Sequence, residues 1–167
     1  QKWQKERNDL GVDSDGNHLW EETIITPEGE LYHKGAYNDI TGWETEDLIK
    51  TPEDFELWSK YYPVPVDANF SRIKAAREKL QDKGIIRSHP FSPGQGSPWQ
   101  SFCTMVGTEE AIMMTFDDPD FVHYALSDIL EKTLKVTEMW QGTPADMVET
   151  GGGAGSKPPS SYNRAVG

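Results

Sequence analysis

The chain has 167 residues, enough for one domain with a hydrophobic core but short of the about 250 residues that a closed (β/α)8 barrel typically needs. Its 28 acidic and 16 basic residues give a formal net charge of -12, so we expect neither nucleic acid nor an anionic membrane as a partner. A single cysteine, Cys103, excludes an internal disulfide and a multi-cysteine metal site, and no apolar run reaches the roughly 18 residues of a membrane span. The first residues contain no secretory apolar core, and we therefore expect a cytoplasmic protein.

The first third of the chain predicts one β-hairpin and two helix starts. Residues Trp20 to Lys34 alternate loosely around Pro27-Glu28-Gly29, which suits a turn with proline at its second position. The polar composition of this hairpin favours a surface attachment over core strands. Helix starts are predicted at Thr45-Glu46-Asp47 and at Thr51-Pro52-Glu53-Asp54, the second with a capping threonine and an acid three residues later.

The middle of the chain alternates helices with a short strand. An amphipathic helix is predicted from Asn69 to Lys83, and the apolar start of Ile85 to His89 is typical of a strand in a covered parallel sheet. A loop rich in proline and glycine follows. Helical segments are then predicted from Trp99 to Val106 and again after Gly107.

The stretch from Phe116 to Gly153 carries the clearest pattern. Asp117 or Asp118 caps a helix whose first position is Pro119. Apolar residues recur at intervals of one or two turns, and the predicted stripe is Phe121, Ala125, Ile129, Val136 and Trp140, widened by Val122, Leu126, Leu130 and Leu134. Gly142 ends the helix, and residues 145–149 predict a buried strand that exits through three glycines. This is the αβ step of an α/β fold, in which groups beyond the strand's C-terminal end usually carry the chemistry.

Two residues at the predicted strand ends are catalytic candidates. His89 could orient a substrate carboxylate or shuttle a proton, and its alternative role is to cap the loop. Glu149 precedes glycines that let a substrate approach the backbone, and its carboxylate could act as acid or base. Arg87 shares a strand face with His89 and could bind an anion, with a structural ion pair as the alternative. Trp99 could form the wall of a flat-ligand pocket, with aromatic core packing as the alternative.

The other reactive residue types are interpreted as structural. Cys103 has apolar neighbours that favour a buried hydrophobic role, and His123 lies within the amphipathic helix. Met113, Met114 and Met139 are expected to fill the core. No glycine pattern is that of a nucleotide-binding loop, so nucleotide binding is rejected.

Several of these motifs occur together in one known family. Ser97-Pro98-Trp99 followed by Met105-Val106, then DPDFVHYALSDILEKTLKV, then ADMVETGGGAG, resembles the uroporphyrinogen decarboxylase superfamily over roughly residues 40–160. Members of that family are (β/α)8 TIM barrels, and they include haem-pathway decarboxylases and methyltransferases that work with corrinoid proteins and thiols such as coenzyme M. The resemblance implies an α/β fold that is part of such a barrel.

The departures from the family pattern favour methyl transfer over decarboxylation. The decarboxylase pattern has a tyrosine at the position of Thr104 and a serine near Gly152. We expect the family's N-terminal arginines and early catalytic aspartate upstream of Gln1. The methyltransferase zinc site, a His-x-Cys pair with a later cysteine, is expected beyond Gly167. No metal or cofactor is therefore expected within this chain, whereas the complete enzyme would use zinc and a corrinoid partner. The expected substrate-binding residues are Arg87, Trp99, Thr104, Gly151 and Gly152.

These predictions divide the chain into three parts and leave three functions open. Residues 1–44 form an N-terminal segment with the hairpin, 45–155 the central helices and strands of the barrel, and 156–167 a loop or disordered tail. The leading function is methyl transfer between a corrinoid protein and a thiol or other acceptor. Tetrapyrrole decarboxylation in haem biosynthesis and a non-catalytic partial-barrel interaction subunit are the alternatives. The expected partners are a small-molecule or corrinoid-protein substrate, and a second copy or a completing chain, because open strand edges promote association.

Overall fold

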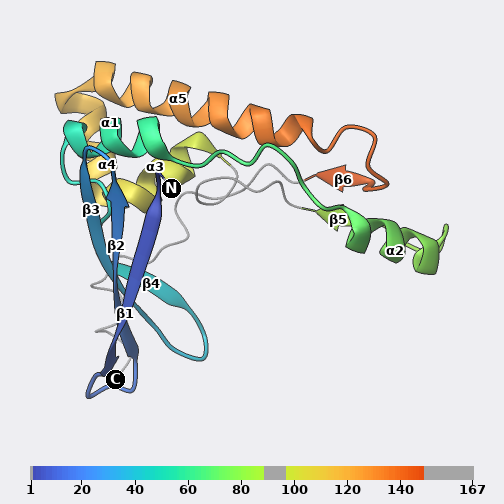
Figure 1. The fold of residues 1–167 in the computed structure, drawn as a ribbon, viewed down its shortest axis with the longest axis horizontal. Helices are drawn as coiled ribbons and strands as arrows, with labels where there is room; N and C mark the ends of the chain where they lie inside the picture. The colour runs from blue at the N-terminus through green and yellow to red at the C-terminus, as the bar shows by residue number, and fades with distance from the viewer. Residues whose placement is uncertain (1, 89–96, 149–167) are drawn as a thin grey trace.

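The computed structural model describes residues 2–88 and 97–148 (Figure 1). Within these ranges the chain forms a four-stranded antiparallel sheet, five helices and a two-stranded parallel sheet. The predicted mixed α/β class is confirmed. The described residues form no closed barrel, and their larger sheet is an antiparallel meander in strand order β1-β2-β3-β4. None of the helices in the described ranges is both long and apolar enough to cross a membrane.

The antiparallel sheet is built around the predicted hairpin, which is confirmed. Its strands are β1 (Gln4–Val12), β2 (His18–Thr26), β3 (Gly29–Tyr37) and β4 (Gly42–Glu46). The two-residue turn Pro27-Glu28 joins β2 to β3. The Thr26 hydroxyl closes this turn, because it donates to the Gly29 carbonyl at 2.7 Å and accepts from the Gly29 N–H at 3.2 Å. The turn fixes the register of the whole hairpin.

Two predictions about this region are wrong. The hairpin is not a surface attachment, because β1 and β4 widen it into a sheet in which alternate residues of β2 are buried and Ile24 and Leu31 are almost fully buried. The helix start at Thr45-Glu46-Asp47 is also wrong, because Glu46 ends β4 and pairs with Lys34 of β3. Cross-strand pairing outweighs the local capping signal there.

A layer of helices covers one end of the sheet (Figure 1). Its members are α1 (Pro52–Tyr61), α3 (Pro98–Val106), α4 (Thr108–Asp117) and α5 (Pro119–Glu138). The Thr51 hydroxyl accepts from the Asp54 N–H, and the Asp54 carboxylate accepts from the Thr51 N–H, so the predicted capping box is confirmed. Asp118 caps α5 as predicted. The core between the layers is Ile24, Leu31, Ile49, Phe55, Trp58, Phe102, Cys103, Met105, Val106, Ala111, Val122, Ala125 and Ile129.

The apolar faces of α4 and α5 differ from the prediction in width. Val122, Ala125, Ile129 and Val136 are buried as predicted, whereas Leu130 and Leu134 are about half exposed. Met113, which we expected in the core, is also half exposed. The buried stripe is narrower because only one side of each helix faces the sheet and its neighbouring helices.

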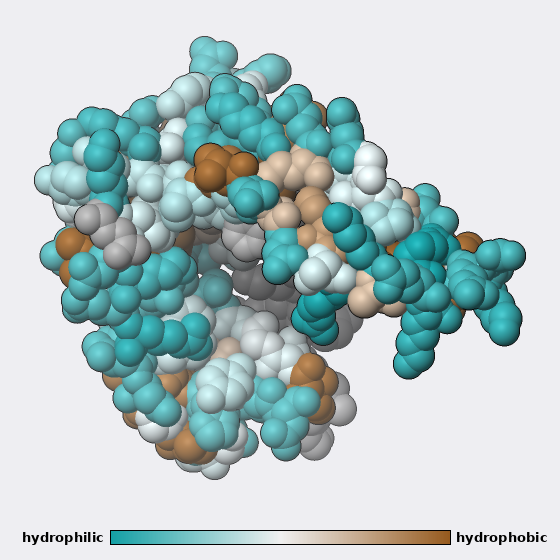
Figure 2. Space-filling view, turned by 45° about the vertical axis from the view of Figure 1, so that its right-hand side comes forward, coloured by the Kyte–Doolittle hydropathy of each residue, from teal (hydrophilic) through white to brown (hydrophobic). Residues whose placement is uncertain are grey.

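A smaller unit projects from the helical layer and is called the arm here. It comprises α2 (Ser71–Leu80), β5 (Arg87–Ser88) and β6 (Met147–Val148). Phe70 meets Trp140 edge to face with ring centroids 4.9 Å apart, which ties the arm to the region after α5. Arg77 of α2 pairs with Asp146, whose carboxylate also accepts from the Ile86 N–H at 2.7 Å. In Figure 2 the surface is mainly hydrophilic, and small groups of apolar residues are spread over several parts of it.

Candidate functional site

The arm contains β5 and β6, the two strands that His89 and Glu149 directly follow in the sequence. β5 and β6 are parallel, with Arg87 opposite Met147 and Ser88 opposite Val148. Ser88 and Val148 are the residues that precede His89 and Glu149. Those two residues, with Gly151 and Gly152, lie outside the described residues. The structure therefore brings together the two strand ends, and it places the exposed Arg87 on one of them.

Trp99 and Thr104 lie in the helical layer on α3. Trp99 is partly buried and packs against Phe102, with ring centroids 6.2 Å apart. The Thr104 hydroxyl donates to the Gln100 carbonyl of its own helix at 2.9 Å. Cys103, on the same helix, is buried, and burial raises the pKa of its thiol. Its burial among the core residues confirms the predicted structural role of Cys103.

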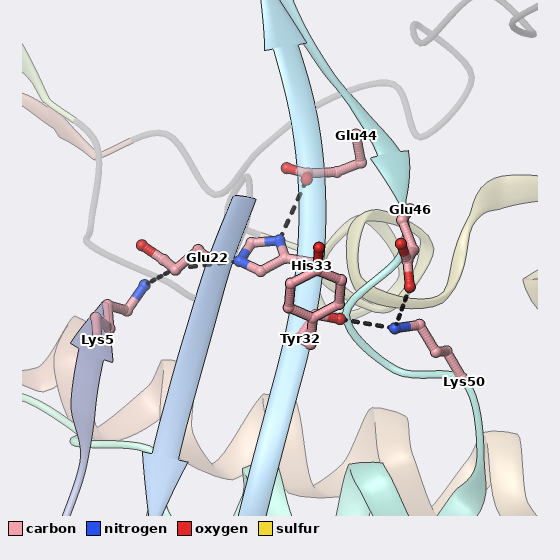
Figure 3. Close-up of polar contacts among 7 residues, drawn as sticks. All are labelled: Lys5, Glu22, Tyr32, His33, Glu44, Glu46 and Lys50. Atoms are coloured by element: carbon pink, nitrogen blue, oxygen red, sulfur yellow. Dashed lines mark hydrogen bonds and ion pairs between the residues drawn. The ribbon is translucent and has the colours of Figure 1, made fainter. Parts of the chain in front are cut away.

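A row of charged side chains crosses the antiparallel sheet, and the sequence reasoning missed it. It consists of Lys5, Glu22, His33 and Glu44, one residue from each of the four strands, and is called the charge row here (Figure 3). Lys5 Nζ lies 2.7 Å from Glu22 Oε1. His33 Nε2 lies 3.1 Å from the same oxygen, and His33 Nδ1 lies 3.2 Å from Glu44 Oε2. Positive and negative groups thus alternate from one edge strand to the other.

The charge row is largely shielded from solvent at its centre. The side chains of His33, Glu22 and Glu44 are 13%, 10% and 21% exposed. Burial alone would lower the pKa of His33, but hydrogen bonds to Glu44 and Glu22 outweigh it and raise that pKa above its ordinary value. Burial alone would raise the pKa of Glu22, but hydrogen bonds from Lys5 and His33 outweigh it and lower that pKa. The geometry therefore favours an imidazolium between two carboxylates.

Aromatic packing holds His33 in place beside the row. The Trp20 and His33 rings meet edge to face, with centroids 5.1 Å apart, and the Arg7 guanidinium lies over the Trp20 ring at 4.0 Å from its centroid. The Trp20 ring can pack against the backbone of Gly35 because glycine has no side chain. A Cβ at this position would lie 2.2 Å from the indole ring. A buried histidine so confined has few alternative orientations.

A second polar network lies on the opposite face of the sheet, also drawn in Figure 3. Lys50 Nζ donates to the Tyr32 carbonyl at 2.8 Å and pairs with Glu46 at 2.7 Å. The Tyr32 hydroxyl donates to Glu21 at 2.7 Å. Because these lysine and glutamate side chains are substantially exposed, the network adds little to stability compared with the charge row.

The charge row can carry a proton but is not arranged to hold a metal ion. An ionised carboxylate only accepts hydrogen bonds, so both ring nitrogens of His33 must donate and neither is free to bind a cation. No three His, Cys, Asp or Glu side chains in the described ranges are grouped to hold a metal. The row's clearest consequence is to join four strands by ion pairs.

Part of the charge row could be predicted from the sequence. Once Pro27-Glu28 is taken as a two-residue turn, counting back from Thr26 and forward from Gly29 places Glu22 opposite His33. Side-chain alternation then puts both on the face of Ile24 and Leu31. Lys5 and Glu44 were not accessible, because β1 and β4 were not predicted.

The fold and the row define a mixed α/β protein with an antiparallel meander sheet, a helical layer and a parallel two-stranded arm. Comparisons with protein families, with characterised proteins and with solved structures found no match for this chain.

Proposed function

We propose that this chain is part of an enzyme of the uroporphyrinogen decarboxylase type, with its active site at the C-terminal edge of β5 and β6. The observation that carries the proposal is the parallel pairing of Ser88 with Val148, the residues before His89 and Glu149. In parallel α/β folds the groups beyond the C-terminal strand ends carry the chemistry. In this proposal β5 and β6 are neighbouring strands of a (β/α)8 barrel, and α3, α4 and α5 lie in the connection between them.

Each residue at this edge has a chemical role in the proposal. Glu149 acts as general acid or base, and His89 orients a substrate carboxylate or moves a proton. Arg87 attracts an anionic group of the substrate, because its guanidinium can bind a carboxylate through two hydrogen bonds. Gly151 and Gly152 allow the substrate to approach the backbone.

The preferred reaction is methyl transfer between a corrinoid protein and a thiol, with tetrapyrrole decarboxylation as the alternative. The preference rests on Thr104, at the position where the decarboxylase pattern has tyrosine. The Thr104 hydroxyl is bonded to the Gln100 carbonyl, so it is turned toward its own helix. A zinc ion would activate the thiol in such an enzyme. Among the described residues, no group of His, Cys, Asp or Glu side chains is arranged to hold it.

The test measures both reactions with the full native protein. Methyl transfer is followed as loss of methylcobalamin in the presence of coenzyme M, and decarboxylation as loss of carboxyl groups from uroporphyrinogen. We expect Glu149→Gln and His89→Gln each to lower the active reaction about 100-fold or more. Glu131→Gln and His123→Gln, which change the same residue types on the exposed side of α5, should leave it unchanged. Absence of both reactions in the native protein would overturn the enzyme proposal.

A non-catalytic interaction subunit is the second candidate, and the arm supports it. α2 has no buried residue, and both Ile85, two residues before β5, and Met147, the first residue of β6, are more than half exposed. Open parallel strands with apolar neighbours are suited to pairing with another chain. Light scattering distinguishes this candidate, because a monomer at micromolar concentration that co-purifies with no partner would contradict it.

A further inference from the structure

Helix α4 presents an apolar face to solvent. Ile112, Met113 and Phe116 are 47%, 50% and 78% exposed, and their spacing places them on one side of the helix. The opposite side is anchored, because Ala111 is fully buried and Met114 packs against the core. The helix cannot turn these three side chains inward without losing its own core contacts.

Acidic residues flank this apolar face on both sides in the sequence. Every charged residue between Thr108 and Val122 is acidic, and all are exposed: Glu109, Glu110, Asp117, Asp118 and Asp120. The exposed side of α5 is different, because Glu131 pairs with Lys135 at 2.7 Å there and charges of both signs are mixed. Apolar side chains that are exposed together on one helix face and flanked by polar residues mark a candidate interaction surface.

We propose that the α4 face, meaning Ile112, Met113 and Phe116 with the five flanking acids, binds an amphipathic helix of a partner protein whose apolar side is flanked by lysine or arginine. The apolar side chains supply anchors of the kind that a helix lays into an apolar surface. Methionine adapts its shape to such a partner. The acids select the charge of the flanking residues and accelerate association.

The charges argue against the other occupants of this face. A symmetric dimer through α4 would place the same acidic residues of two copies against each other, in a chain whose formal net charge is already -12. An anionic membrane would be repelled for the same reason, since helices that lie on membranes carry basic residues on their polar side. A basic amphipathic helix would bury the exposed apolar side chains and place its lysines or arginines beside the acids.

The probe is a fluorescein-labelled synthetic helical peptide with leucines along one side and lysines flanking them, tested on the full chain by fluorescence anisotropy. A second peptide carries glutamate at each lysine position. We expect the lysine peptide to bind at least tenfold more tightly than the glutamate peptide, and to bind more weakly as salt is raised from 50 to 500 mM because screening weakens exposed charge pairs. Equal binding of the two peptides, or no binding of the lysine peptide up to 1 mM, would overturn the proposal.

Matched variants locate the binding surface. Phe116→Ser should lower affinity for the lysine peptide at least tenfold, whereas Leu134→Ser, a half-exposed apolar residue on α5, should leave it unchanged. The combined variant Glu109→Gln, Glu110→Gln and Asp117→Asn should remove most of the salt dependence. Both serine variants should keep the wild-type circular dichroism spectrum, because both side chains are exposed. If the native chain is instead a dimer that Phe116→Ser converts to a monomer, a second copy is the occupant and the proposal is wrong.

Discussion

Replacing Gly35 by alanine tests the packing of the sheet with a single methyl group. The added Cβ would lie 2.2 and 2.5 Å from two carbons of the Trp20 ring and 2.8 Å from the Trp43 carbonyl oxygen. The carbonyl belongs to the backbone of β4, and Trp20 is held between Arg7 and His33. The ring must therefore leave its position, or the two strands must separate.

The magnitude follows from the atoms that the added methyl group would meet. Overpacking a filled interior costs about 1–3 kcal/mol. Because both the ring and the β4 backbone obstruct the methyl group, we expect a loss of about 2–3 kcal/mol, which lowers the Tm of a chain of this length by about 4–12 °C. Gly42→Ala is the matched control, since its Cβ would meet only ordinary contacts at 3.4 and 3.5 Å. Alanine in a strand is otherwise favoured over glycine by about 0.5–1 kcal/mol, so this control should be neutral or slightly stabilising.

The assay is thermal unfolding of both variants, followed by circular dichroism in the far and near ultraviolet. The near-ultraviolet signal of the folded Gly35→Ala protein should also change, because Trp20 must reorient. If the two alanine variants unfold within 1 °C of each other and keep the wild-type near-ultraviolet spectrum, the packing of Trp20 against Gly35 is not as described.

Three further predictions concern the charge row and the helical layer. In the folded chain the pKa of His33 is raised above its ordinary value of 6.5. The free energy by which protonated His33 stabilises the fold is therefore fully present below pH 6.5 and is lost as pH rises through the folded-state pKa. Tm should therefore fall between pH 6.5 and 9 in the wild type, less so in His33→Gln, and as much as in the wild type in the exposed-histidine control His123→Gln. Thr51→Ala removes the capping hydroxyl of α1 and should cost about 1 kcal/mol in urea unfolding, whereas Thr51→Ser should cost little. Phe55→Ala should cost about 3–5 kcal/mol in the same assay, because this fully buried ring contacts Trp58, Phe121 and Tyr124; a loss below 1 kcal/mol would contradict its place in the core.

The helices could be predicted from the sequence because their signals are local. The cap, the proline and the acid at Thr51 to Asp54 lie within one turn, and α1 begins there. Asp118 and Pro119 mark the start of α5 in the same way. The strands Arg87–Ser88 and Met147–Val148 fall inside the predicted segments but are shorter than predicted. The prediction that the second strand is buried is wrong, because Met147 is 52% exposed.

The sheet could be predicted only in part because its outer strands depend on distant contacts. The sequence of β1 has no alternation of polar and apolar residues, and none of its residues is buried. This segment is a strand because it pairs with β2. β4 has two glutamates and one tryptophan in five residues, which gives no strand signal. Burial of Glu22 likewise depends on Lys5 and His33, which approach it from neighbouring strands.

The candidate sites also divide into a part that local sequence predicts and a part that depends on distant contacts. The place of Arg87 near a strand end is predicted from the sequence. That its strand lies beside the strand before Glu149 is known only from the pairing of Ser88 with Val148 in the structure. The α4 face could not be predicted, because the helical spacing of Ile112, Met113 and Phe116 is also that of a buried side. Only the packing of Ala111 and Met114 decides which side of α4 faces solvent.

The charge row also bears on how the chain reaches its fold. A β2–β3 hairpin that slips by one residue turns every side chain of one strand to the other face, so His33 would lose Glu22 while Leu31 would leave the face of Ile24. The correct hairpin is distinguished from slipped ones by charge pairing and by burial at once. The β2–β3 hairpin has the shortest loop of the sheet and therefore the lowest entropic cost of closure. Within it, the pairing of Glu22 with His33 distinguishes the correct register without any contribution from β1 or β4.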